Sequence, residues 1–150
     1  MKFKNAMLIV KDIDVSCKFY KDVLGLRVIF GVNKTLTGGL VLQTLDSYKK
    51  LSGLEDISFK SNSFELYLEE DDFDAFIKKL KKMDISYVHQ LIEHGWGQKV
   101  VRFYDPDLHI IEVGENIKAV CLRFLNSGMS KEEVAKRMDV PLKFVESCMR

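Results

Sequence analysis

Apolar residues recur along the chain at two spacings, and these predict strands and helices in the same order twice. In the first half, Val15, Phe19 and Val23 lie four residues apart, which is typical of one face of a helix. An acidic residue precedes this stretch and can cap the helix, and Gly25 ends it. Strands are expected at residues 3–10, at 26–31, and on both sides of the Gly38-Gly39 turn within 35–45.

The second half of the chain repeats this order. Residues 64–69, FELYLE, alternate apolar and polar side chains, as a strand with one buried face does. A stripe of apolar residues at helical spacing follows. Its members are Phe73, Phe76, Ile77, Leu80 and Met83. The remaining strands of this half are expected at residues 85–89, 99–104 and 109–113.

The repeated order of one strand, one helix and three strands predicts the fold. We expect an α+β protein in which two βαβββ modules form a curved, cleft-bearing mixed sheet. The modules cover about residues 1–45 and 63–114, and the polar residues 46–62 link them. Together they make one domain, residues 1–114, and residues 115–150 form a helical C-terminal extension.

Strand alternation indicates which side chains line the cleft. Leu66 and Leu68 must pack under the helix, so Glu65 and Tyr67 face the concave side. The same parity places these residues in the cleft: Asn5, Met7, Gln43, Glu65, Tyr67 and Glu112. Several of them carry amide or carboxylate groups, so the sequence predicts a polar binding site.

Two further residues are candidate ligand contacts. Trp96 is flanked by Gly95 and Gly97, which allow its loop to bend. Its indole either stacks on a flat ligand at the cleft mouth or closes the end of the sheet. Arg102 is a charge in mid-strand that needs a partner, and it either binds a ligand anion or pairs with a glutamate.

Composition and charge narrow the function classes. The chain has 23 Lys+Arg and 22 Asp+Glu, a net charge of +1, which disfavours nucleic-acid binding and a polybasic membrane anchor. The sequence contains neither a membrane-spanning apolar window nor a signal-peptide pattern. We therefore expect a cytoplasmic protein whose partner is a small molecule rather than a membrane or a nucleic acid.

Two segments carry a family resemblance: KDIDVSCKFYKDVLGLRVIF and GWGQKVVRFYDPDLHIIEV. With the βαβββ repeat, they resemble the glyoxalase, bleomycin-resistance and dioxygenase superfamily, also called vicinal oxygen chelate proteins. The resemblance covers about residues 3–114. Its most specific motif is Asp105-Pro106-Asp107, with Glu112 seven residues after the first aspartate. Leu108 stands where the family commonly has glycine.

The resemblance also implies a metal site. Metal-dependent members hold a divalent cation with four side chains, and these positions fall here on Asn5, Gln43, Glu65 and Glu112. Both usual histidines are absent, and the remaining oxygen ligands suit magnesium, manganese or calcium. We expect no cofactor, or at most a weakly bound divalent cation. Alternatively, Asn5 and Gln43 hydrogen-bond the glutamates in a metal-free cleft, where Glu65 or Glu112 is a candidate catalytic acid or base.

Residues 115–150 extend beyond the resemblance. Ser130 and Glu133 form a predicted capping box at the start of a helix. The surrounding sequence, GMSKEEVAKRMDVPLKFVESC, is similar to a bacterial helix-turn-helix. Its last helix carries few cations, which favours a helical hairpin that packs or forms a dimer over a DNA-reading element.

Three functions follow as hypotheses. The first is a homodimeric small-molecule-binding protein, similar to the antibiotic-sequestering members, without a tightly held transition metal. The acidic residues of its cleft favour a cationic ligand. The first alternative is a divalent-metal-dependent lyase, isomerase or dioxygenase of the same superfamily. The second alternative is a ligand-sensing regulator with a helix-turn-helix-like tail.

Overall fold

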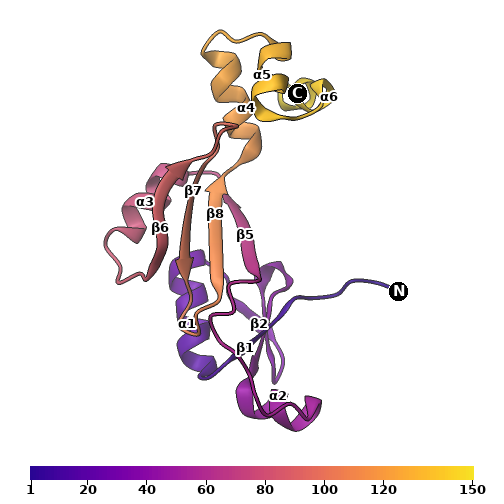
Figure 1. Ribbon diagram of the computed structural model, residues 1–150, viewed down its shortest axis with the longest axis vertical. Helices are drawn as coiled ribbons and strands as arrows, with labels where there is room; N and C mark the ends of the chain where they lie inside the picture. Colours follow the sequence, from indigo (N-terminus) through magenta and orange to yellow (C-terminus); the bar gives the residue numbers. More distant parts are fainter. The chain divides into compact units, whose positions relative to one another are not determined.

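The computed structural model describes all 150 residues, and the chain divides into two compact units. Unit 1 comprises Met1–Phe64 together with Asp105–His109. Unit 2 comprises Glu65–Tyr104 and Ile110–Arg150. Each unit contains one four-stranded mixed sheet with the predicted order of strand, helix and three strands (Figure 1). The predicted α+β class with two βαβββ modules and C-terminal helices is confirmed.

The sheet of unit 1 has the strand order β1-β4-β3-β2. β1 and β4 are parallel, and the other pairs are antiparallel. The elements of this unit are β1 (Met7–Val10), α1 (Ile13–Leu24), β2 (Val28–Phe30), β3 (Lys34–Leu36), a 3-10 turn (Thr37–Gly39), β4 (Val41–Thr44) and α2 (Leu45–Ser52).

Local chemistry sets the ends of α1. The Asp12 carboxylate caps the helix by accepting from the backbone N–H groups of Asp14 and Val15. Gly25 ends the helix in the left-handed conformation, with φ of 70°, which costs glycine little. The predicted helix with Gly25 at its end is therefore confirmed.

Unit 2 repeats the arrangement with the strand order β5-β8-β7-β6. Its elements are β5 (Glu65–Glu70), α3 (Phe73–Leu80), β6 (Tyr87–Glu93), β7 (Lys99–Tyr104), β8 (Ile110–Glu115), α4 (Ile117–Asn126), α5 (Lys131–Met138) and α6 (Leu142–Cys148). Ile77 and Leu80 of α3 line a pocket with Tyr87 and Val101. The helix therefore covers the face of β7 that carries Val101, and alternation puts Arg102 on the opposite face.

The three C-terminal helices α4, α5 and α6 lie together in Figure 1. They share an apolar core of their own. The buried members of this core are Val120, Cys121, Phe124, Val134, Met138 and Val145. Ser130 and Glu133 form the predicted capping box, with both reciprocal hydrogen bonds present. None of the helices is long and apolar enough to cross a membrane.

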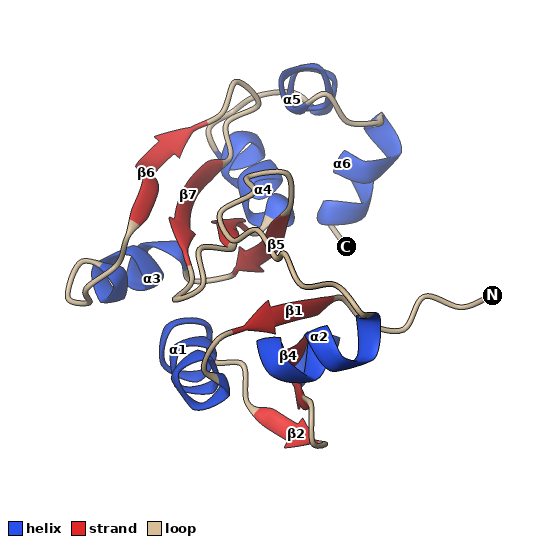
Figure 2. Ribbon diagram, turned by 60° about the horizontal axis from the view of Figure 1, so that its bottom comes forward, coloured by secondary structure: helices blue, strands red, loops and turns tan.

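Several predicted boundaries were wrong. The strand expected at residues 85–89 is Tyr87–Glu93, the first strand begins at Met7 rather than residue 3, and Met83 lies beyond α3. The expected linker begins with α2, which packs on β1 and β4 (Figure 2). Its start is capped by Thr44, whose side chain accepts from the Ser47 N–H. Residues 46–62 show no clear period in the sequence, which predicts only a helical turn near residues 48–51, and α2 is longer than that turn.

Candidate functional site

Strand register brings several polar side chains together on one face of the unit 2 sheet. Tyr67 pairs with Glu112, Glu112 pairs with Arg102, and Arg102 pairs with His89, on four adjacent strands. Paired residues point to the same side of a sheet, as do alternate residues within a strand. We call this surface the Arg102 face, and its polar members are Glu65, Tyr67, Glu69, His89, Arg102 and Glu112.

Arg102 is the centre of this face. Its Nε donates to Glu65 Oε2 at 3.0 Å, and its Nη2 pairs with Glu112 Oε2. Glu112 is buried, with 7% of its side chain exposed, so an opposite charge is needed to offset its desolvation. The sequence left two roles open for Arg102. The structure shows that Arg102 pairs with two glutamates.

His89 completes the network around the guanidinium. Its Nδ1 lies 2.8 Å from the carbonyl oxygen of Gln90, which can only accept a hydrogen bond. Its Nε2 lies 3.0 Å from Nη1 of Arg102, which can only donate. These two contacts together assign the neutral tautomer with the proton on Nδ1.

A second network connects Tyr67 to the loop that carries Trp96. The buried Gln98 donates through Nε2 to the Tyr67 hydroxyl at 2.7 Å, and accepts at Oε1 from the Trp96 indole N–H at 3.1 Å. The Tyr67 hydroxyl in turn donates to Glu69 at 3.1 Å. Gly114 makes room for these side chains, because a Cβ there would lie 2.8 Å from Gln98 Nε2.

Trp96 forms a stacked pair with His94, with ring centroids 4.2 Å apart and an interplanar angle of 28°. The indole is 40% exposed, and Tyr67 is 50% exposed. Gln98 therefore joins two partly exposed aromatic rings, one of which, Tyr67, lies on the Arg102 face. The role of Trp96 in ligand binding stays a prediction.

The predicted site residues of unit 1 have other partners within that unit. The Asn5 amide donates to the carbonyl oxygen of Gly39 at 2.6 Å. Gln43 is buried, and its amide donates to the hydroxyl of Ser47 in α2 at 3.1 Å. Met7 is 48% exposed. Within unit 1, Asn5 and Gln43 thus hydrogen-bond Gly39 and Ser47, and their pairing with Glu65 and Glu112 stays a prediction.

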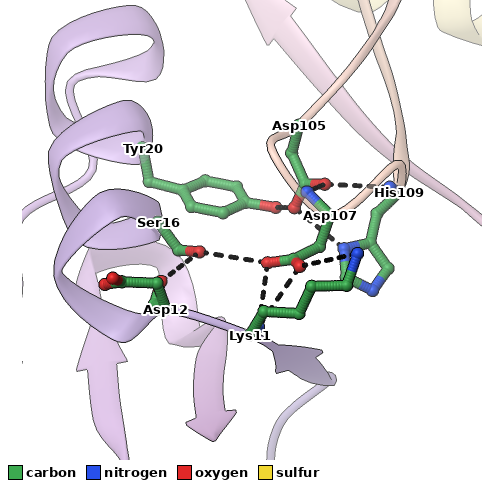
Figure 3. Close-up of polar contacts among 7 residues, drawn as sticks. All are labelled: Lys11, Asp12, Ser16, Tyr20, Asp105, Asp107 and His109. Carbon is green, nitrogen blue, oxygen red and sulfur yellow. Dashed lines mark hydrogen bonds and ion pairs between the residues drawn. The ribbon is translucent and has the colours of Figure 1, made fainter. Parts of the chain in front are cut away.

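The Asp105-Pro106-Asp107 motif forms a different cluster, in unit 1 (Figure 3). Asp105 is buried, and its Oδ2 accepts from the Tyr20 hydroxyl and contacts His109 Nδ1, both at 2.8 Å. Asp107 accepts from the Lys11 N–H at 3.2 Å and from the Ser16 hydroxyl at 3.4 Å. The motif therefore satisfies buried polar groups and holds its loop against α1.

The backbone conformation at Leu108 explains why the family commonly has glycine at this position. Its φ is 68°, in the left-handed region, where a side chain costs about 1 kcal/mol or more. The loop keeps this turn because Asp105 Oδ1 accepts from the N–H groups of Asp107 and His109 on either side, both at 2.9 Å. The departure from the family pattern therefore changes strain and leaves the loop geometry in place.

Burial shifts the titration of this cluster. Desolvation raises the pKa of Asp107, and the neighbouring Asp105 charge adds to the rise, while the Lys11 N–H opposes it. Desolvation likewise raises the pKa of Tyr20, with Asp105 contributing, so Tyr20 stays a hydrogen-bond donor.

Comparison with known proteins decides the family. The model of the glyoxalase-like domain matches residues 3–118. The chain belongs to this family. Residues 119–150, which hold most of the C-terminal helices, lie outside the match.

Curated relatives and solved structures resemble parts of the chain. The metallothiol transferase FosB of Staphylococcus saprophyticus is 28% identical over 107 residues, covering 69% of this chain and 70% of that protein. A protein of unknown function from Agrobacterium tumefaciens C58 is 32% identical, with a TM-score of 0.69, covering 77% of this chain and 94% of that one. A glyoxalase/bleomycin resistance protein/dioxygenase family enzyme from Burkholderia phytofirmans shares the fold, with 16% identity, a TM-score of 0.61, and coverage of 75% and 96%.

The family resemblance implies a metal, but the residues at its four positions do not fit one. Glu65 and Glu112 share the guanidinium of Arg102, which would repel a divalent cation placed between them. The neutral amides of Asn5 and Gln43 add no charge to the set.

Three participants in these networks were not predicted as site residues. They are Glu69, His89 and Gln98. Gln98 precedes Arg102 by four residues. Strand alternation therefore predicts from the sequence that both side chains point to the same side of the sheet. His89 required the register of two strands, which its sequence position alone does not give.

The raised pKa of Asp107 predicts a pH dependence of stability. Below the usual carboxyl pKa of about 3.9, both the folded and unfolded states are protonated and the contribution is complete. As the pH rises through the raised folded pKa, the unfolded state ionises first and this stability is lost. Asp107→Asn cannot ionise. The difference between its unfolding free energy and that of the wild type should therefore move in favour of the variant as the pH rises above the usual carboxyl pKa of about 3.9.

Urea unfolding at a series of pH values measures this difference. The exposed Asp56→Asn is the matched control for the loss of one carboxylate. A pH-independent difference for Asp107→Asn would contradict the assignment.

Proposed function

We propose that this glyoxalase-like protein binds a small organic cation on the Arg102 face and works without a tightly held metal. The observation that carries the proposal is the pairing of Arg102 with both Glu65 and Glu112. The protein's own guanidinium supplies the positive charge that a metal ion supplies in metal-dependent relatives. Both candidate catalytic glutamates are engaged in this pairing, so we assign them to charge balance.

The charge of the face supports a cationic ligand. Glu65, Glu69 and Glu112 carry three negative charges against one positive charge on Arg102, an excess of two. Trp96 and Tyr67 present partly exposed rings, and an indole or phenol face attracts a cation. Carboxylates beside aromatic rings are the chemistry that recognises ammonium and amidine groups.

One specific observation favours a second candidate. The similar Staphylococcus proteins are named metallothiol transferases, which supports a metal-dependent enzyme. In this chain, such chemistry requires Arg102 to leave the two glutamates. The hypothesis of a ligand-sensing regulator has less support. A helix that binds DNA needs several cationic side chains, and Lys143 is the single cationic residue of α6.

We also propose that the protein is a homodimer. The edge strand β2 supports this, because Val28, Ile29 and Phe30 are exposed on a sheet edge with unpaired backbone groups. A second copy of the chain is the occupant that this proposal assigns to the edge.

Metal titration tests the central observation. The wild type should bind Mn²⁺, Ni²⁺ and Zn²⁺ no more tightly than about 1 mM. Arg102→Met frees two carboxylates and removes the repelling charge, so it should gain at least about tenfold in affinity for Mn²⁺. Isothermal titration calorimetry on chelator-treated protein measures both values.

The exposed Arg27→Met serves as the matched control for loss of one positive charge, and its metal affinity should equal that of the wild type. Tight stoichiometric metal binding by the wild type would overturn the proposal and favour the metal-dependent enzyme.

Ligand charge is tested with two aromatic probes of opposite charge. Phenyltrimethylammonium should change the fluorescence of Trp96, the single tryptophan, at lower concentration than benzenesulfonate does. Glu69→Gln keeps an acceptor for Tyr67 but removes one charge, and it should weaken cation binding severalfold. The exposed Glu132→Gln should not. If benzenesulfonate binds as tightly as phenyltrimethylammonium or more tightly, the assignment of a cationic ligand is wrong.

A further inference from the structure

We propose that the C-terminal extension is part of the ligand site, because α4 clamps the loop His94–Gln98 and fixes the position of Trp96. This inference rests on the proposed function only in giving Trp96 a ligand. The clamp itself consists of contacts within unit 2. It gives a role to helices that the family match does not include.

Arg123 provides the polar half of the clamp. Its Nη2 donates to the carbonyl oxygen of Gly97 at 2.7 Å and to Glu115 Oε2 at 2.9 Å. The same Glu115 oxygen accepts from the Lys99 N–H at 2.9 Å, at the start of β7. A charged pair thus holds both the loop and the strand that follows it.

Phe124 provides the apolar half. Its ring lies against Gly97, where a Cβ would come within 2.2 Å of the ring edge. Gly97 also has φ of 88°, a conformation that glycine adopts readily. Glycine is therefore required here both for the turn and for the close approach of α4. Gly95, two residues earlier, has open space around it.

The clamp is itself supported by the C-terminal helices. Phe124 belongs to the buried core shared by α4, α5 and α6. The Arg137 guanidinium of α5 lies 4.6 Å from the centre of the Phe124 ring and 3.9 Å from Glu93, just before the loop. The helices therefore contact the loop at Gly97 and the end of the strand that precedes it at Glu93.

Hydrogen bonds transmit this position to the Arg102 face. Gln98, at the end of the clamped loop, donates to the carbonyl oxygen of Glu115 at 2.8 Å as well as to Tyr67. The same side chain accepts from Trp96. Fixing the loop thus fixes the relative placement of the two aromatic rings that we assign to the ligand.

Acrylamide quenching of fluorescence tests the clamp without any ligand, because Trp96 is the single tryptophan. Arg123→Met should raise the quenching constant by about half or more, since the loop opens locally. Lys118→Met on the same helix is the matched control, because Lys118 is exposed and its side chain is not part of the clamp. Arg123→Lys, which keeps the charge, should restore part of the protection.

Thermal unfolding separates a local effect from loss of fold. If Arg123→Met unfolds, Phe124→Leu, which thins the apolar half alone, is measured in its place and should also raise quenching. Unchanged quenching in the folded variants would overturn the clamp.

Phenyltrimethylammonium titration then connects the clamp to the site. Arg123→Met should weaken its binding severalfold, while Lys118→Met should not. If Arg123→Met raises the quenching of Trp96 but leaves the affinity for phenyltrimethylammonium unchanged, the extension has no role in the ligand site. Failure of the wild type to bind the probe would count against the proposed function, while quenching would still decide the clamp.

Discussion

The arrangement of the polar face in unit 2 depends on one guanidinium between two carboxylates. Glu112 is buried on a central strand, and an unpaired charge there would cost several kcal/mol. Arg102 removes that cost and engages Glu65 and neutral His89 at the same time. The face can therefore keep three carboxylates without a bound metal. Its remaining negative charge is the basis on which we propose a cationic ligand.

Much of the fold could be predicted because local sequence patterns determine its strands and helices. Alternation in FELYLE and the four-residue spacing around Phe19 predict the repeated module, and Gly25 ends its helix where expected. The same alternation correctly separates Glu65 and Tyr67 from Leu66. The partner of Arg102 was left open, because it depends on the register of three strands that sequence parity alone does not fix.

The most specific motif belongs to the fold rather than to the chemistry of the proposed site. Asp105 and Asp107 accept hydrogen bonds from the loop backbone, Tyr20 and Ser16, all within unit 1. Leu108, with its positive φ, shows the strain that this loop accepts to keep those bonds. The site networks, in contrast, run through Gln98 and Arg123, whose importance arises only when distant elements meet. A short motif identifies a family, whereas long-range contacts determine how the side chains of one member are arranged on its polar surface.

A crystal structure grown with manganese chloride tests the central claim most directly. Anomalous scattering locates manganese independently of how the side chains are built. The account predicts no anomalous peak between Glu65 and Glu112, with the Arg102 guanidinium in that space. A peak within about 2.5 Å of oxygens from both glutamates, with Arg102 displaced, would contradict it.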